Sequence, residues 1–323
     1  MNVTYVSNEA YSQYLGAGLY SLYDNNKDEK QLNVYIISIG MQKASLKKLK
    51  ATAKLFNREV NIIDFNNIKD KLGEKTKTGR FDSSIMGRVF LGELLPEKVK
   101  KVIYLDCDTI VLGSLRKLWQ LALYSNIMAA VPEPTVSADI KKAAGLHRDY
   151  LYYNSGVLLI NLELWRRENI KEKVLAYHKS ISRACFFNDQ DALNGVLAYR
   201  IKLLPPKYNF FSNYKYWNYK ELVKATPKYE IITRKEYEAS KVHPVILHFA
   251  GDERPWNKGC LNYYRRAYDK YAKLSMWEDK RASGKRVYMF LYHLMNLSTM
   301  FCPCLRHRLS AEYLKHIKSG KRY

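Results

Sequence analysis

Short apolar runs alternate with longer amphipathic stretches along most of the chain, and this alternation limits the fold more than any other feature. The apolar runs are typical of buried strands, and the longer stretches carry apolar residues at helical spacing. Alternation at this pace predicts an α/β protein with a mostly parallel sheet and flanking helices. In such sheets ligands bind outside the carboxyl ends of the strands, so functional side chains are expected there. The expected strands are residues 3–6, 33–39, 60–63, 101–105, 127–131, 157–161 and 244–247, and the expected helices are residues 11–23, 43–56, 83–95 and 164–181.

The chain has 323 residues, enough for one large domain with an appendage. Its 47% apolar and 26% charged residues are those of a globular protein and do not suggest disorder. The 54 lysines and arginines outnumber the 31 acidic residues, which gives a net charge of +23. A surplus this large indicates a polyanionic neighbour: nucleic acid, anionic lipid or a phosphorylated substrate.

Two features predict the compartment. The five cysteines are odd in number and show no zinc-like spacing, which favours reduced thiols in a cytosolic protein. The amino terminus lacks the basic segment and the long apolar run of a secretory signal. We therefore expect a cytoplasmic location.

The composition changes at about residue 280, which divides the chain into a main domain, residues 1–280, and a tail, residues 281–323. The tail contains a largely apolar run, residues 287–305, with basic residues on both sides. Polar residues interrupt this run, so it is a poor membrane span. Two interpretations stay open: a basic amphipathic tail lying on an anionic membrane, or a helix packed on the main domain with a solvated basic face.

Two aspartates, Asp106 and Asp108, follow the expected strand 101–105 directly. Carboxylates at the end of a buried strand are costly unless a cation meets them. A divalent ion such as Mg²⁺ or Mn²⁺ on a pyrophosphate would be such a partner. The alternative is a turn in which Asp106 caps backbone amides. The position after a buried strand favours the metal site.

A histidine, His248, ends the expected strand 244–247, and Gly251 and Arg254 follow it at three-residue steps. An imidazole added to two carboxylates favours Mn²⁺ over Mg²⁺. Gly251 would allow the backbone to approach a phosphate, and Arg254 could neutralise that phosphate. A lone histidine at a strand end is more often structural, so the prediction depends on the joint pattern.

Polar clusters occur at three further places. Residues 188–194 open an expected helix with acids at its positive end, and they could equally face a sugar. Residues 152–156 place small polar groups before the strand 157–161. In the expected helix 83–95, Ser84, Arg88 and Gly92 share one stripe, which leaves room for a ligand beside Arg88, although such an arginine is usually on the surface.

Four ordered motifs give the chain a resemblance to glycosyltransferase family 8, which includes glycogenin and bacterial lipopolysaccharide and lipooligosaccharide galactosyl- and glucosyltransferases. The motifs are residues 104–108 (YLDCD), 153–162 (YNSGVLLINL), 188–191 (NDQD) and 248–256 (HFAGDERPW). They have family-like separations within residues 1–260. The resemblance implies the GT-A type nucleotide-sugar transferase fold with a Rossmann-like sheet. The basic tail is similar to the membrane-associating tail of a bacterial lipooligosaccharide galactosyltransferase.

Carried over by position, the resemblance implies a role for individual residues in binding a UDP-hexose donor and Mn²⁺, with Mg²⁺ as the alternative. Asp106, Asp108 and His248 would hold the metal on the UDP pyrophosphate. The reacting sugar would meet Arg88, Asp189 and Gln190. The other donor-binding residues would be Asn8 and Tyr11 at the uracil, Cys107 within the metal motif, Glu133, Asn154 and Ser155 around the sugar, and Gly251 and Arg254 at the diphosphate.

Three positions depart from the family pattern. Arg254 stands where the family usually has lysine, and Ala10 replaces a polar residue that can contact the ribose. Glu133 replaces a shorter aspartate, which leaves the choice between glucose and galactose open.

The implied reaction is retaining transfer of galactose or glucose from the UDP-sugar to a glycan or glycolipid acceptor. Retention usually means a covalent intermediate on a carboxylate. Gln190 matches the position nearest the reacting carbon, and an amide is a poor nucleophile, so attack from the front face is favoured over a covalent adduct on Asp189. The acceptor is expected to meet the loops 133–149 and 207–228.

The resemblance places this reaction in lipopolysaccharide or other surface polysaccharide assembly, at the inner face of the plasma membrane. Deleting residues 281–323 should then weaken liposome binding and spare donor hydrolysis. One competing interpretation is a basic nucleic-acid-binding protein, but the sequence has no RNA-binding or helix-turn-helix motif, so nucleic acid is not expected as a partner. The other is a UDP-sugar-binding family member without turnover.

Overall fold

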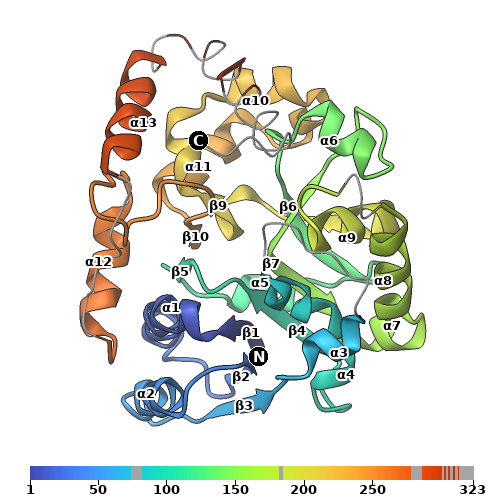
Figure 1. The fold of residues 1–323 in the computed structure, drawn as a ribbon, viewed down its shortest axis with the longest axis vertical. Helices are drawn as coiled ribbons and strands as arrows, with labels where there is room; N and C mark the ends of the chain where they lie inside the picture. Colours follow the sequence, from blue (N-terminus) through green and yellow to red (C-terminus); the bar gives the residue numbers. More distant parts are fainter. Residues whose placement is uncertain are drawn as a thin grey trace.

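The computed structural model describes residues 1–73, 82–181, 185–277 and 286–299, together with residues 302, 305, 308, 309 and 312. Its main layer is a seven-stranded sheet (Figure 1). In chain order the strands are β1 (Asn2–Asn8), β2 (Asn33–Ile39), β3 (Val60–Asp64), β4 (Lys101–Leu105), β6 (Met128–Pro132), β7 (Tyr153–Asn161) and β8 (Ile201–Leu203). Their order in the sheet is β3-β2-β1-β4-β7-β6-β8. Because β7 alone runs antiparallel to its neighbours, the predicted mostly parallel sheet is confirmed.

Helices cover both faces of this sheet and bury two apolar cores against it. Successive strand residues point to opposite faces. On β4, Val102 and Tyr104 therefore enter one core, whereas Ile103 and Leu105 enter the other. The core of Ile103 includes residues of α1 (Ser12–Asp24), α2 (Lys43–Lys54) and α5 (Arg116–Gln120). The core of Val102 includes residues of α3 (Ile68–Leu72), η2 (Ser83–Phe90), α4 (Leu91–Leu94), α7 (Leu162–Arg167), α8 (Ile170–Ile181) and α9 (Asp189–Leu197).

A second sheet of three strands joins distant motifs. It consists of β5 (Thr109–Val111), β10 (Ile246–His248) and β9 (Phe210–Phe211), in that spatial order. Since β5 begins one residue after Asp108 and β10 ends at His248, their antiparallel pairing brings these two residues together. A third, aromatic-rich core lies against this sheet. It draws on η4 (Ser212–Tyr216), α10 (Tyr219–Ala225), η5 (Pro227–Ile231), α11 (Arg234–Val242) and α12 (Arg265–Leu274), and the remaining short helices are η1 (Glu9–Tyr11), α6 (Ala138–Ala143) and η3 (Pro206–Tyr208).

The prediction of one α-helix over residues 83–95 is wrong. The segment forms the 3₁₀ helix η2 and then the single α-turn α4. In a 3₁₀ helix residues three apart are aligned, so Ser84, Arg88 and Gly92 do not share a stripe. A β-carbon at Gly92 would lie 2.8 Å from the Trp165 ring, so this glycine allows tight packing and leaves no space for a ligand.

The prediction of one helix over residues 164–181 is also wrong. The structure has two helices, α7 and α8, and Asn169 lies between them with a φ of 52°. A non-glycine residue in the left-handed region ends the first helix, and asparagine tolerates this conformation better than most residues.

The first helix described in the tail is α13 (Arg286–Thr299), which lies above α12 at the upper left of Figure 1 and contacts residues 252–261. The expected boundary at residue 280 and most of the tail's basic residues lie outside the described residues. Residues 286–299 form a helix that contacts the main domain, but its outer face is apolar rather than basic. Its buried residues are Met289, His293, Asn296 and Thr299, whereas Val287, Phe290, Leu291, Leu294 and Leu297 are exposed. Within the described part of the chain, no helix has both the length and the apolar character needed to cross a membrane.

Candidate active site

Asp106, Asp108 and His248 converge at the edge of the main sheet. One ligand atom from each residue lies within 4.8 Å of the others. The Nε2 atom of His248 is 3.2 Å from Asp108 Oδ1 and 4.0 Å from Asp106 Oδ2. Two carboxylates and an imidazole at this spacing form a donor set that suits a divalent cation. The fold thus brings the three expected metal ligands together.

Local backbone bonds explain this convergence. The amide of Asp106 donates to the Gly156 carbonyl of β7 at 2.8 Å, which continues the β4–β7 ladder by one residue. The hydroxyl of Thr109 then donates to the Asp106 carbonyl at 2.7 Å, which closes a tight turn. On the far side of the turn, Thr109 pairs with His248, and the Phe249 amide donates to the Asp108 carbonyl at 3.0 Å. Asp108 and His248 are therefore fixed as neighbours by main-chain pairing.

Gly156 is required at this point because a side chain here would fill the space between His248 and Asp106. A β-carbon on Gly156 would overlap the His248 imidazole and would lie 2.9 Å from Asp106 Oδ2. The glycine in the 153–162 motif thus leaves room for a residue of another motif.

Asn209 sets the orientation of the His248 ring. Its Oδ1 lies 2.8 Å from His248 Nδ1, and its Nδ2 donates to Asn154 Oδ1 at 2.8 Å. An amide oxygen only accepts, so this network assigns the hydrogen to Nδ1. The Nε2 lone pair is left facing the two carboxylates, as a metal ligand requires.

The charges in this cluster attract a cation. Burial alone would lower the pKa of His248, but the Asp108 carboxylate outweighs that effect and raises the pKa above its ordinary value. Burial would likewise raise the pKa of Asp108, yet His248 and Arg254 leave it lowered. The two pKa values shift in opposite directions because the Asp108 carboxylate and a cation beside it stabilise each other, and that cation can be the protonated imidazole or a divalent ion.

A buried arginine, Arg88, joins this cluster to the helix α9. Its guanidinium forms ion pairs of 3.0 Å with Asp106 Oδ1 and with Asp189 Oδ2, and it donates to the Ser155 carbonyl. Only 6% of Arg88 is exposed, so it is not a surface residue. Burial acts to lower its pKa, but the two carboxylates raise it well above the ordinary value. Arg88 therefore carries a fixed positive charge.

A network of amides surrounds Gln190 at the start of α9. Asn154 Nδ2 donates to Gln190 Oε1 and to Glu133 Oε2, both at 2.9 Å. Gln190 Nε2 donates to Glu133 Oε2 at 3.1 Å, and the Ser155 amide donates to Gln190 Oε1 at 3.0 Å. Burial raises the pKa of Glu133 despite these donors. The fold thus collects four expected sugar-site residues from three segments.

Asp189 is nearly fully buried, and its Oδ2 is shared between Arg88 and the Ser155 hydroxyl, which donates at 3.2 Å. Burial raises the pKa of Asp189 to about 6 even though Arg88 opposes the shift. A carboxylate held in this way orients Arg88 and Ser155 toward the Gln190 network.

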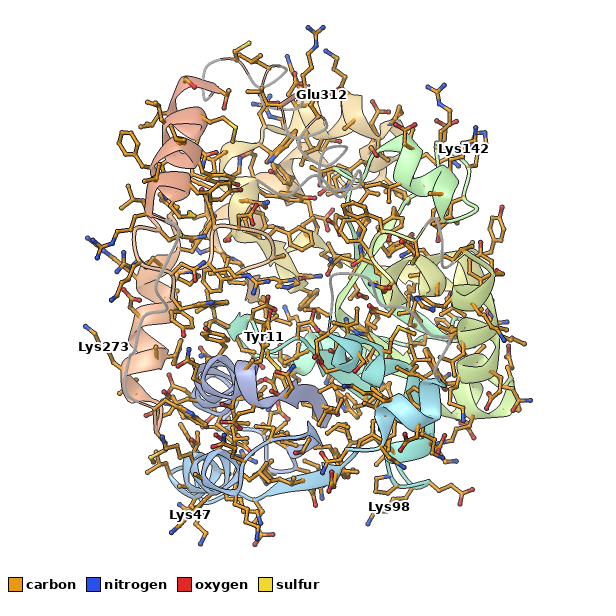
Figure 2. All side chains as sticks on the ribbon, in the orientation of Figure 1. Tyr11, Lys47, Lys98, Lys142, Lys273 and Glu312 are labelled. Carbon is orange, nitrogen blue, oxygen red and sulfur yellow. The ribbon has the colours of Figure 1, made fainter. Side chains whose placement is uncertain are left out.

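The expected uracil and diphosphate residues form a second group beside Asp108. Arg254 Nη1 donates to the Tyr11 hydroxyl at 2.7 Å, and Arg254 Nη2 lies 3.9 Å from Asp108 Oδ2. Gly251 has a φ of 86°, which favours glycine. Asn8 Oδ1 accepts from the Tyr11 amide at 3.2 Å and so caps η1. Tyr11 lies near the centre of the molecule in the view of Figure 2.

Cys107 is the expected donor-binding residue whose side chain faces away from the cluster. Its thiol donates to the Val6 carbonyl in β1 and is buried in the core that includes Ile103. Burial raises the pKa of this thiol far above its ordinary value. Only the backbone of Cys107 is placed for a contact with a ligand.

This arrangement can be compared with known proteins. The family described as Glycosyl transferase family 8 matches residues 2–260, which is most of the chain. The chain belongs to glycosyltransferase family 8. The predicted membership and the enzyme class are confirmed by this match.

Individual relatives of this family 8 chain agree with the match. General stress protein A of Bacillus subtilis is 28% identical over 280 residues, which covers 86% of this chain and 94% of the relative. A lipopolysaccharide 1,2-glucosyltransferase of Escherichia coli is 24% identical and covers 86% of this chain and 79% of the relative. The crystal structure of the galactosyltransferase LgtC superposes with a TM-score of 0.72 at 22% identity, covering 86% of this chain and 97% of LgtC. That likeness confirms the predicted GT-A type fold.

Sequence reasoning missed two residues of the site of this family 8 chain. The Tyr104 hydroxyl donates to Asp106 Oδ1 at 2.6 Å, and its ring lies 4.6 Å from the Arg88 guanidinium. The two-residue period of a strand could have placed Tyr104 on the face of Asp106. No such periodicity identifies Asn209, because it lies in the loop 207–228, which is expected to meet the acceptor.

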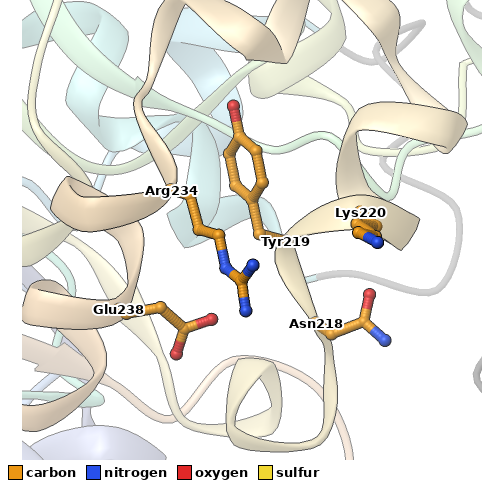
Figure 3. A pocket seen from close by; sticks show the side chains of 5 residues that line it. All are labelled: Asn218, Tyr219, Lys220, Arg234 and Glu238. Carbon is orange, nitrogen blue, oxygen red and sulfur yellow. The ribbon is translucent and has the colours of Figure 1, made fainter.

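A separate shallow pocket lies between α10 and α11 (Figure 3). It contains none of the expected donor or metal residues, but part of its wall lies in the loop 207–228 that is expected to meet the acceptor. Arg234 and Glu238 come from α11, and the chain around the start of α10 supplies the opposite wall. The residues that line it are Asn218, Tyr219, Lys220, Arg234 and Glu238.

Proposed function

We propose that this chain transfers galactose or glucose from a UDP-sugar to a glycan acceptor with retention of the anomeric configuration. The observation that carries the proposal is the convergence of Asp106, Asp108 and His248 between two groups of residues. Arg254, bonded to Tyr11, meets the cluster at Asp108, and the Arg88 network meets it at Asp106. This arrangement supports a site with the nucleotide on one side of a metal and the reacting sugar on the other.

We assign the metal site to Mn²⁺, with Mg²⁺ as the alternative. The donor set fits, since two carboxylate oxygens and the Nε2 atom of a neutral imidazole face one point. When bound, the ion would supply positive charge to the diphosphate as the bond to the sugar breaks. Asp106, Asp108 and His248 would hold it there.

The residues of the chain add to this electrostatic stabilisation. Arg254 carries a charge held by Asp108 and by the Tyr11 hydroxyl, so it can meet a diphosphate without a large rearrangement. Tyr11 offers a ring for stacking on the uracil, and the left-handed backbone at Gly251 lets main-chain amides approach a phosphate. These contacts would stabilise the departing UDP.

The Gln190 network supports a sugar site. Glu133 offers carboxylate acceptor atoms at its edge, and Asn154 and Gln190 orient this carboxylate by donating to its Oε2. A sugar hydroxyl is recognised by such a fixed set, because a wrong epimer leaves a buried polar group unpaired. The longer side chain of Glu133 would therefore contribute to the choice between glucose and galactose.

The burial of Asp189 supports front-face attack over a covalent adduct. Its Oδ2 is already engaged by Arg88 and Ser155, and its side chain is almost fully covered. Separate Asp189→Asn and Gln190→Ala variants test this. Each variant is incubated with donor, quenched and analysed by mass spectrometry. No adduct on any variant is expected. A trapped glycosyl group on Asp189 would replace front-face attack with double displacement.

We assign the acceptor to lipopolysaccharide or another surface polysaccharide, because relatives named as lipopolysaccharide glucosyl- and galactosyltransferases share the family. The deciding experiment is UDP release from UDP-glucose and UDP-galactose with and without Mn²⁺. We expect one donor to be clearly preferred and chelation to abolish release. Binding of both donors without release in any acceptor mixture would favour a family member without turnover.

The outer face of α13 supports binding to the inner face of the plasma membrane. Phe290, Leu294 and Leu297 are 67%, 52% and 63% exposed, and the flanking sequence is basic. An apolar stripe with basic flanks suits an anionic bilayer, at about 1 kcal/mol per basic residue near the surface. This assignment makes the protein a peripheral enzyme of the cytoplasmic side.

Co-sedimentation with anionic and neutral vesicles tests this surface. Replacing Phe290, Leu294 and Leu297 with serine should reduce binding to anionic vesicles at least about tenfold, since each apolar side chain contributes on the order of 1 kcal/mol or more. Tyr199→Ser is the control, because Tyr199 is 95% exposed on another part of the molecule. Equal binding by the triple variant and the control would exclude α13 as the membrane contact.

A further inference from the structure

The inner face of α13 contacts the loop that carries the diphosphate residues. Glu253 is fully buried, and its Oε1 accepts a hydrogen bond from Asn296 Nδ2 at 2.5 Å. The Nδ1 atom of His293 lies 3.8 Å from the same oxygen. A helix that lies outside the family match thus meets a carboxylate one residue away from Arg254.

Further contacts fasten the same helix to both ends of this loop. The Tyr288 hydroxyl donates to Asp252 Oδ2 at 3.0 Å. The Leu261 amide donates to His293 Nε2 at 2.9 Å, and a β-carbon at Gly259 would lie 3.7 Å from the Arg286 Cα atom. Polar residues on one face of α13 therefore define where residues 251–261 lie.

The loop transmits this position to the donor site through Arg254. The Arg254 amide donates to the Asp252 carbonyl at 2.8 Å, and its Nε donates to the Gly251 carbonyl at 3.0 Å. These bonds direct the guanidinium to the Tyr11 hydroxyl and toward Asp108. A shift of Glu253 would move Arg254 with it, because the two residues are adjacent and the loop is short.

We propose that Asn296 and Tyr288 are positioning residues for the donor diphosphate, and that they act through Glu253, Asp252 and Arg254. Without the Asn296 donor, the buried Glu253 carboxylate loses a charge-assisted hydrogen bond. Moving this carboxylate toward water then lowers the free energy of the loop. Arg254 would then be held less firmly. This inference rests on the proposed role of Arg254 at the diphosphate. It replaces the expectation from the sequence that deleting residues 281–323 spares the donor reaction, because the deletion should weaken donor binding as well as membrane binding.

The test measures UDP binding in the presence of Mn²⁺ by calorimetry, using the full chain. Asn296→Ala should raise the Kd for UDP about tenfold and raise the donor KM while leaving kcat within about twofold, since about 1.4 kcal/mol is a tenfold change. Leu294→Ala is the matched control on the outer face of the same helix and should bind as the wild type does. In an Arg254→Ala background, Asn296→Ala should have no further effect.

Two outcomes overturn the inference. The first is an Asn296→Ala variant that folds and binds UDP as well as Leu294→Ala does. The second is an equal loss of affinity with and without Arg254, because the effect would then be a general loss of structure. Should Asn296→Ala not fold, Tyr288→Phe removes only an exposed hydrogen bond, and an unchanged Kd for UDP in that variant overturns the inference equally.

A second readout separates this inference from the proposed function. Hydrogen exchange of the peptide that contains residues 251–257 should be faster in Asn296→Ala than in Leu294→Ala, with no ligand present. A wild-type protein that does not bind UDP with Mn²⁺ contradicts the proposed function. Unchanged exchange in this loop contradicts the positioning role, whatever the protein binds.

Discussion

Arg88 and Lys141 are both buried cations, with 6% and 1% exposed, but their surroundings have opposite effects. Arg88 lies between two carboxylates, Asp106 and Asp189, which raise its pKa. Lys141 donates to neutral oxygens, the Thr226 hydroxyl and the Arg148 carbonyl, and its burial lowers its pKa to about 8. The expected donor side thus pairs its buried cation with two carboxylates. A loop expected to meet the acceptor instead contains a buried cation, Lys141, whose desolvation lowers the free energy of unfolding.

The largest expected effect comes from removing each cation in turn. Arg88→Met leaves the buried Asp189 and the partly buried Asp106 without their partner, and breaking a buried ion pair costs about 3–5 kcal/mol of folding free energy. UDP release should fall at least about a hundredfold, because several kcal/mol of stabilisation at the reacting group is lost. Lys141→Met should retain most activity. Denaturation curves and UDP release measure both, and equal losses in the two variants would contradict the comparison.

The next largest expected effect concerns the space that Gly156 leaves open beside His248 and Asp106. In Gly156→Ala the new methyl group overlaps His248 and crowds Asp106, so Mn²⁺ affinity should fall about ten- to a hundredfold, as it does when a residue that orients a metal ligand is mutated. Gly113→Ala is the control, since its β-carbon would make ordinary 3.7 Å contacts with Val245. Calorimetric titration with Mn²⁺ decides this. Unchanged affinity in Gly156→Ala would mean that His248 is not a ligand.

The smallest expected effect is a pH dependence of the free energy of unfolding, caused by Lys141 in a loop that is expected to meet the acceptor. Lys141 has a pKa of about 8 in the folded protein and its ordinary value near 10.5 in the unfolded chain. Between these values the unfolded state binds more protons, so the free energy of unfolding of the wild type rises with pH. Relative to Lys141→Met, the wild type should gain stability from pH 8 to 10.5 and show no trend from pH 6 to 7.5. A constant difference across the whole range would show that Lys141 is not desolvated.

Six of the seven strands of the main sheet could be predicted from the sequence because each contains an apolar run, whereas β8 was not expected, since its three residues include a lysine. The strand over residues 101–105 has the observed bounds, and it placed the acids of the metal motif correctly at a strand end. The contacts between motifs could not be predicted. They depend on the pairing of β5 with β10 and on the close approach of Gly156 to His248, which join residues far apart in the chain.

Two local failures have physical reasons. The 3₁₀ form of η2 has no distinct apolar period in the sequence, since its buried residues 86–90 are consecutive. For the tail, the sequence left open a helix lying on a membrane or a helix packed on the main domain with a basic outer face. In the structure, Asn296 and His293 face the domain because Glu253 is buried beneath them, and a buried partner cannot be seen in the sequence of the helix.

The central claim is that the Nε2 atom of His248 binds the same divalent cation as Asp106 and Asp108, on the diphosphate of UDP. Pulsed electron paramagnetic resonance of the Mn²⁺–UDP complex measures this directly. We predict hyperfine coupling to one imidazole nitrogen and to phosphorus, with the nitrogen coupling lost in His248→Ala. Phosphorus coupling without any nitrogen coupling in the wild type would contradict the account.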